Sequence, residues 1–86
     1  EFGLINRVVD DEKLEEATLE LANTLASKSP LALEIGKTGI YKMSDLEYHK
    51  AADYMSELFA SLAATEDAVE GVNAFIEKRQ PNFKKR

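Results

Sequence analysis

The 86-residue sequence contains no cysteine and no tryptophan, only one histidine and only two prolines. Without cysteine, neither a disulfide framework nor a thiolate zinc site can stabilise the chain, so packing must hold it together. No run approaches the roughly eighteen consecutive apolar residues of a membrane span, and the N-terminus lacks the basic-then-apolar order of a signal peptide. We therefore expect a soluble, cytoplasmic protein with no membrane partner.

The net charge of -5 argues against nucleic acid as a partner, because binding to phosphates requires a basic face that releases counterions. The charge is unevenly distributed along the chain. Acidic residues crowd positions 10–20, whereas the tail carries five basic residues and no acidic one: Lys78, Arg79, Lys84, Lys85 and Arg86. An anionic ligand would meet this tail first. The alternative is that its charges are only solvated, as terminal charges usually are.

Residues 4–9 are rich in β-branched side chains and lie between Gly3 and two aspartates, which predicts a short strand. A single strand cannot form a sheet, because its backbone donors and acceptors need partners that no other part of the chain offers. This isolated strand is a first indication that sequence is missing upstream of Glu1.

Helical periodicity dominates the rest of the chain. Apolar residues recur at three- and four-residue steps from residue 10 to about residue 28, with Asp10 or Asp11 available as a cap. Ser29 and Pro30 predict the start of a second helix that runs to about residue 42, since serine caps well and proline is tolerated at the first helical position.

A capping box of Ser44 and Glu47 predicts the start of a long third helix, whose apolar stripe over residues 48–63 is the strongest periodic signal in the sequence. Thr65 predicts the cap of a fourth helix, which Pro81 ends. Residues 1–86 form one unit without an internal repeat. We expect an all-α fold with a short N-terminal strand-like segment and about four helices. Because so short a chain buries only a modest part of its surface, we also expect a partner surface.

Gly36 and Gly39 lie inside the predicted second helix, where each would weaken an isolated helix by roughly 1 kcal/mol relative to alanine. Close approach of a neighbouring backbone would explain both glycines. A hinge, or simple tolerance of glycine, is the alternative.

Groups that could carry out catalysis are scarce, because catalysis needs a positioned acid, base or nucleophile with an orienting partner. His49 lies off the main apolar stripe of its helix, which favours a surface or boundary position over a role as a base. No serine lies at a spacing from His49 that indicates a relay, and metal-binding and dinucleotide-binding motifs are absent. We therefore expect no catalytic residue and no metal site, and the residues alone indicate a binding or assembly module.

The segment from Thr65 to Phe83, TEDAVEGVNAFIEKRQPNF, strongly resembles the ending of the enoyl-CoA hydratase/isomerase family, also called the crotonase family. Residues 3–9, GLINRVV, resemble a strand of the same family, and residues 26–32, ASKSPLA, resemble the start of one of its helices. The order and spacing of the three motifs match across the whole chain. Each motif would be weak evidence alone, and their combination argues against a chance match.

This resemblance implies that the chain is the C-terminal helical region of a larger acyl-CoA enzyme. In such enzymes an upstream spiral carries the catalytic acids and the backbone amides that hold the thioester oxygen, and the C-terminal helices serve assembly into trimers or hexamers. The catalytic residues would then lie upstream of Glu1, so the chain alone is expected to be inactive. The resemblance further implies a homo-oligomer, an acyl-CoA substrate that brings coenzyme A with it, no tightly bound cofactor, and a cytoplasmic location or, in a eukaryote, the mitochondrial matrix.

By resemblance, Phe59, Phe75 and Lys78 match family residues that line the adenine and phosphate end of the CoA site. Phe75 and Lys78 are three residues apart on the predicted fourth helix, so their side chains are expected to be neighbours that offer an apolar plate beside a cation. The alternative is that both phenylalanines only pack between helices and that Lys78 is a solvated charge.

The leading interpretation is therefore an assembly and CoA-proximal segment of a hydratase/isomerase-type enzyme, whose reaction and acyl substrate stay open. The alternative is a stand-alone helical module that binds a protein partner without catalysis, which the excess of apolar helix faces favours. An enzyme complete within 86 residues is not expected.

Overall fold

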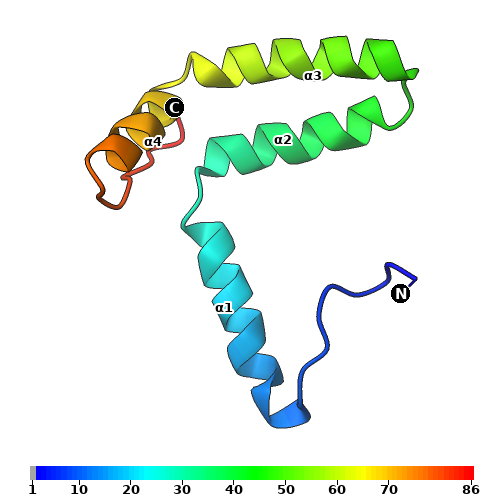
Figure 1. The fold of residues 1–86 in the computed structure, drawn as a ribbon, viewed down its shortest axis with the longest axis vertical. Coiled ribbons are helices and arrows are strands. Elements are labelled where there is room, and N and C mark those ends of the chain that lie inside the picture. Colours follow the sequence, from blue (N-terminus) through cyan, green and yellow to red (C-terminus); the bar gives the residue numbers. More distant parts are fainter. Residues whose placement is uncertain (1) are drawn as a thin grey trace.

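The computed structural model describes residues 2–86 and consists of helices joined by short turns (Figure 1). A short 3-10 helix, η1 (Asp11–Lys13), leads into α1 (Leu14–Ala26), and three helices follow: α2 (Pro30–Met43), α3 (Tyr48–Ala63) and α4 (Glu66–Ile76). Within this part of the chain no strand forms, and the predicted all-α class is confirmed. None of the helices described is both long and apolar enough to cross a membrane.

The N-terminal segment, residues 4–9, runs back along α1 as an irregular stretch (Figure 1). The prediction of a strand is wrong for this structure, because a strand needs a partner for its amides and carbonyls and residues 2–86 supply none. Only Val9 of this segment is partly buried. Asp10 precedes η1, but its side chain makes no capping hydrogen bond.

The helices are arranged openly. α2 and α3 lie antiparallel, α1 leads away from α2, and α4 lies at the end of α3, near the start of α2 (Figure 1). The radius of gyration is 16.3 Å, against about 12 Å for a compact domain of this length. Among the residues described, Ala74 is the only apolar side chain that is buried. The chain alone thus has almost no apolar core, which is the physical basis for expecting a partner surface.

The absence of a side chain at Gly39 allows α2 and α3 to pack closely. This residue is buried, and a Cβ atom added to it would overlap Cδ2 of Leu58 and lie 3.2 Å from Sδ of Met55. Gly39 therefore allows a close approach, but by the side chains of Leu58 and Met55 and not by a neighbouring backbone as predicted. Gly36 has open space where its Cβ atom would be, so no contact within the described chain explains it.

Two predicted helix starts are confirmed. Ser29 Oγ accepts a hydrogen bond from the amide of Ala32 at 3.3 Å, and Pro30 is the first residue of α2. At the start of α4, Thr65 Oγ1 accepts from the amide of Ala68 at 3.2 Å. Each cap satisfies one of the amides that a helix N-terminus leaves without a partner.

The capping box predicted from Ser44 and Glu47 does not form. Ser44 follows the last residue of α2, and its hydroxyl donates to the carbonyl of Tyr41 at 2.7 Å. Glu47 is itself the N-cap of α3, where its carboxylate accepts from the amides of His49 and Lys50. A carboxylate at this position is also favoured by the helix dipole, so α3 begins directly after Glu47.

Thr65→Ala is expected to lower the free energy of unfolding by about 1 kcal/mol, because it removes the hydroxyl that caps α4. Thr18→Ala is the matched control. Thr18 is exposed within α1, and its hydroxyl only bonds back to the carbonyl of Leu14, so its removal should change the unfolding free energy by less than about 0.5 kcal/mol. Denaturant unfolding compares the two variants, and equal effects would contradict the capping role.

Candidate functional site

The fourth helix ends earlier than Pro81 predicts. Its last residue is Ile76, Glu77 occupies the C-cap, and the backbone of Lys78 is left-handed with a φ of 55°. The expectation that Phe75 and Lys78 are neighbours on one helix is therefore wrong, because Lys78 lies beyond the helix end. The chain turns sharply between the two residues.

Two backbone hydrogen bonds produce this turn. The amide of Lys78 donates to the carbonyl of Phe75 at 3.3 Å, and the amide of Arg79 donates to the carbonyl of Ala74 at 3.0 Å. This pair of bonds is a Schellman motif, in which the residue with positive φ is usually glycine. The Cβ atom of a lysine disfavours that conformation, so contacts elsewhere must hold Lys78 in it.

Phe59 and Phe75 are largely exposed, with 73% and 85% of their surface accessible. Phe59 lies on α3 and lines an open apolar groove of about 380 Å³ together with Val69 and Val72 of α4. Phe75 lies three residues beyond Val72 on α4, outside the residues that line this groove. The structure thus brings Phe59 next to α4 and leaves both rings available at the surface, since neither is covered within the described chain.

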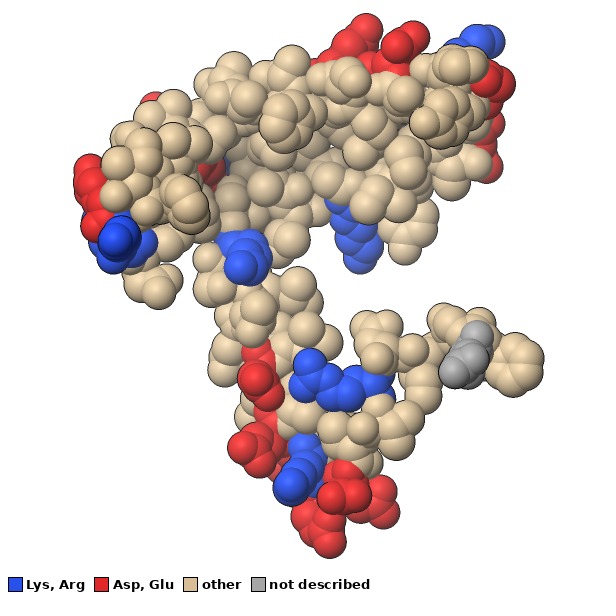
Figure 2. Space-filling view, in the orientation of Figure 1, with Lys and Arg blue, Asp and Glu red and all other residues tan. Residues whose placement is uncertain are grey.

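The basic tail is partly neutralised by carboxylates. Three of its five cations form ion pairs: Arg79 with Glu70 and Glu77, Lys85 with Glu34, and Arg86 with Glu66. Figure 2 shows acidic side chains over α1 and basic side chains beside acidic ones around α4. Exposed pairs of this kind contribute little to stability. Within residues 2–86 no ion pair involves Lys78 or Lys84.

Glu70 joins the tail to α4. Arg79 Nη1 donates to Glu70 Oε1 at 2.5 Å and Nη2 donates to Oε2 at 3.1 Å, a two-point contact. The amide of Asn82 donates to the same Oε1 at 2.8 Å. The Arg79 guanidinium and then the Asn82 amide lower the pKa of Glu70 from 4.5 to about 2, and Glu70 and Glu77 raise the pKa of Arg79. Glu70 is therefore ionised at any physiological pH.

Asp67 is the only buried charged residue in the described chain, with 3% of its surface accessible. Its carboxylate accepts from Ser29 Oγ at 2.8 Å and from the amides of Lys84 and Lys85 at 2.8 and 3.1 Å. Its own amide donates to the carbonyl of Arg86 at 2.7 Å. Burial raises the pKa of Asp67, but the hydrogen bonds together hold it below its ordinary value. One side chain thus connects α4, the start of α2 and the tail.

Neither Asp67 nor Glu70 is predicted as a site residue from the sequence. Their tail partners are 9 to 19 residues away along the chain, a separation that leaves no periodic signal. The one signal that could have found them is their place in the TEDAVEG stretch that carries the family resemblance.

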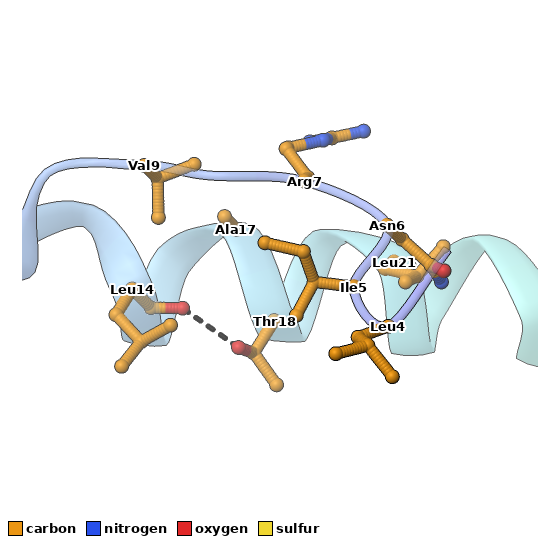
Figure 3. A pocket seen from close by; sticks show the side chains of 9 residues that line it. All are labelled: Leu4, Ile5, Asn6, Arg7, Val9, Leu14, Ala17, Thr18 and Leu21. Atoms are coloured by element: carbon orange, nitrogen blue, oxygen red, sulfur yellow. Dashed lines mark hydrogen bonds between the residues drawn. The ribbon is translucent and has the colours of Figure 1, made fainter. Parts of the chain in front are cut away.

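A second groove lies between the N-terminal segment and α1 (Figure 3). Its volume is about 320 Å³, and Ile5 and Val9 point from the segment toward the helix. Arg7 also lines the groove, and its guanidinium lies 4.0 Å from the carboxylate of Glu20 on α1. The lining is mostly apolar; its polar members are Asn6, Arg7 and Thr18, and it includes no histidine or carboxylate.

His49 lies at the surface, as predicted. Its ring is 5.4 Å from that of Tyr48 in an edge-on arrangement. Nowhere in residues 2–86 do three or more histidine, cysteine or acidic side chains gather closely enough to hold a metal ion. The candidate site residues stay Phe59 on α3, Phe75 on α4 and Lys78 in the turn after α4, and the groove beside Phe59 includes neither of the other two.

Comparison with known proteins gives the class of protein. The model of the enoyl-CoA hydratase/isomerase family matches residues 1–86, and the chain belongs to this family. A 2,3-dehydroadipyl-CoA hydratase of Escherichia coli is 38% identical over 84 residues, which are 98% of this chain and 33% of that protein. A methylmalonyl-CoA decarboxylase of the same species is 34% identical over 83 residues, 94% of this chain and 32% of that protein. The chain thus spans about a third of the length of these relatives.

Solved structures of the family share the fold. An enoyl-CoA hydratase from Bacillus anthracis superposes with a TM-score of 0.90 at 32% identity, covering 98% of this chain and 33% of that one. An enoyl-CoA hydratase/isomerase from Mycobacterium paratuberculosis gives a TM-score of 0.87 at 37% identity, with 98% and 33% covered. The open arrangement of helices is therefore the one that the matching stretch adopts within longer chains.

Proposed function

We propose that the chain is the C-terminal assembly region, and part of the CoA-binding surface, of an enzyme that acts on acyl-CoA thioesters with hydratase/isomerase-type chemistry. The observation that carries this proposal is the family match over all 86 residues by a chain that spans about a third of its relatives. Two of those relatives, a hydratase and a decarboxylase, are named for reactions on CoA compounds. The CoA moiety is then the part of the substrate that is the same for these family members, whereas the acyl group differs.

The scarcity of catalytic groups among residues 2–86 supports the idea that the reaction is carried out elsewhere in the polypeptide. The catalytic acids and the amides that hold the thioester oxygen would lie upstream of Glu1. The family acts on CoA thioesters without a tightly bound cofactor, so coenzyme A would enter only as part of the substrate. A mouse relative that is 35% identical is named as mitochondrial, which supports a mitochondrial matrix location as the counterpart, in a eukaryote, of the bacterial cytoplasm.

Phe59, Phe75 and Lys78 are the proposed contacts with CoA. The two exposed rings offer apolar faces that suit stacking with adenine. The ammonium of Lys78 forms no ion pair with the described residues and suits a phosphate. The left-handed turn at Lys78 sets the position of its cation relative to the end of α4.

The exposed apolar helix faces are the proposed assembly surface of a homo-oligomer, a trimer or hexamer as the family resemblance implies. One such face lies on α2, where Leu33 and Ile40 line an open groove of about 460 Å³. Burying faces of this kind would supply the apolar contacts that the open chain lacks. Nucleic acid and membranes are not expected among the partners.

Lys78→Ala and Phe75→Ala in the full-length protein are each expected to weaken CoA binding roughly tenfold, through loss of a charge-assisted contact and of a stacking contact respectively. Calorimetric titration with CoA measures the change. Lys50→Ala removes the same charge from the exposed start of α3 and should leave the affinity unchanged. Equal affinity of all three variants would contradict the proposed contacts.

A stand-alone helical module that binds a protein partner is the second candidate function, favoured by the lack of an apolar core within the described chain. Sedimentation of the 86-residue chain and of the full-length protein separates the two proposals. An assembly region predicts a single closed oligomer of the full-length protein. A stand-alone module predicts that the chain exists without further catalytic sequence and forms a complex with an unrelated protein.

A further inference from the structure

Lys78 occupies a backbone conformation that lysine does not favour. Its φ is 55°, at the position of the Schellman motif where glycine is usual. Glycine would make the same turn without strain, because it has no Cβ atom. The side chain of Lys78 is exposed and forms no ion pair within residues 2–86, so it gives the fold no compensating contact of that kind. Strain of this type persists where neighbouring contacts enforce it, and it clusters at ligand sites.

The two neighbours of Lys78 are joined to each other and to α4. Arg79 Nε donates to Glu77 Oε2 at 2.5 Å, which connects the residues on either side of Lys78. The Arg79 guanidinium also bonds to both oxygens of Glu70, seven residues before Glu77 and thus about two turns back on the helix. Glu70 Oε1 in addition accepts from the amide of Asn82. One carboxylate therefore fixes the segment on the far side of Lys78 at two points.

We infer that Glu70 is a positioning residue, which acts through Arg79 to hold the backbone of Lys78 left-handed and so to fix the Lys78 ammonium for the phosphate-bearing end of CoA. This inference rests on the proposed function, in which Lys78 contacts CoA. Arg79 orients and does not bind the ligand, because its guanidinium already bonds to two carboxylates that an incoming phosphate would have to displace.

The test compares two ligands of the full-length protein, CoA and pantetheine, which is the part of CoA without the nucleotide and its phosphates. Glu70→Gln keeps the size of the side chain and removes the charge that holds Arg79. We expect it to lower the affinity for CoA by roughly fivefold or more, since a charge-assisted contact is misplaced, and to leave the affinity for pantetheine unchanged. Glu66→Gln is the matched control on α4, where Glu66 pairs with Arg86, and it should alter neither affinity.

Two further variants separate positioning from general damage to the fold. Arg79→Lys keeps the positive charge but loses the planar fork, and it should reproduce the effect of Glu70→Gln. Lys78→Gly should raise the melting temperature, because it relieves the strain, and at the same time lower the affinity for CoA. In the Lys78→Gly background, Glu70→Gln should cause no further loss of CoA affinity, because the group that it positions is gone.

Equal losses of affinity for CoA and pantetheine in Glu70→Gln would overturn the inference, because they would indicate a purely structural role. An unchanged CoA affinity in Glu70→Gln, combined with a reduced one in Lys78→Gly, would also overturn it and would leave the proposed function standing. If the unaltered protein does not bind CoA, the proposed function itself fails, and the inference fails with it.

Discussion

Gly39→Leu is expected to lower the free energy of unfolding by about 3 kcal/mol, because the new side chain has no room between α2 and α3. Even the Cβ atom of the leucine would overlap Cδ2 of Leu58 and lie 3.2 Å from Sδ of Met55. The flexible thioether of Met55 can move aside. Leu58 is branched and partly buried, so the two helices would have to separate and expose the surface that they share.

Denaturant unfolding, followed by circular dichroism, measures this effect. Gly36→Ala is the matched control, because Gly36 lies in the interior of the same helix with open space around the position of its Cβ atom. Alanine favours the helix over glycine, so the control should raise the unfolding free energy by up to about 1 kcal/mol. A Gly39→Leu variant as stable as the parent would mean that α2 and α3 do not pack as the structure has them.

The helix starts at Ser29 and Thr65 could be predicted from the sequence because all the groups involved are local. Each hydroxyl accepts from an amide three residues further along the chain. The failure at Ser44 has an equally local cause. Glu47 supplies a carboxylate that caps α3 unaided, and the hydroxyl of Ser44 bonds back to the preceding helix. The sequence alone does not show whether Ser44 or Glu47, three residues apart, caps α3.

The end of α4 could not be predicted because its usual signal is missing. Glycine normally marks the left-handed residue that stops a helix, whereas lysine occupies that position here. Pro81 was the only visible stop, and it lies five residues beyond the true end at Ile76. The candidate contact between Phe75 and Lys78 changed for this reason. The two residues are assigned to the CoA site by their resemblance to the family. The turn between them places Lys78 beyond the end of α4, so the two side chains do not share one helix face.

The contacts of the tail depend on folding of distant segments onto one another, which no local pattern encodes. Asp67 bonds to the amide of Lys84, 17 residues away, and Ser29 reaches Asp67 across 38 residues. The predicted strand at residues 4–9 failed for a related reason, since a strand depends on a partner outside these residues. Local periodicity therefore predicts the helices, but it does not predict the contacts between helices and between α4 and the tail.

Asp67→Asn is expected to detach the tail from α4. The amide group would replace one acceptor oxygen with donor hydrogens, facing the amides of Lys84 and Lys85 that now donate to the carboxylate. It would also weaken the acceptor for Ser29 Oγ, so the link to the start of α2 would be weakened as well. We expect amide exchange at Lys84 and Lys85 to accelerate by roughly tenfold or more, because unmade hydrogen bonds to a charged group leave these amides open to water.

Hydrogen-exchange mass spectrometry or NMR at neutral pH measures this release. Asp53→Asn is the matched control, because Asp53 is an exposed residue of α3 and no hydrogen bond or ion pair of its carboxylate occurs in the described chain. It should leave the exchange of the tail unchanged. Normal protection of Lys84 and Lys85 in Asp67→Asn would contradict the role assigned to the carboxylate.

Acid should release the tail in the same way, because both carboxylates that hold it have lowered pKa values. The pKa of Glu70 falls from 4.5 to about 2, and that of Asp67 also lies below its ordinary value. Their contribution to stability is thus complete above about pH 4.5 and is lost as the pH falls through the lowered values. The amide NMR signals of Asn82 and Lys84 should hold their positions down to about pH 4.5 and shift toward pH 2. A shift that is complete above pH 4.5 would mean that neither carboxylate holds the tail.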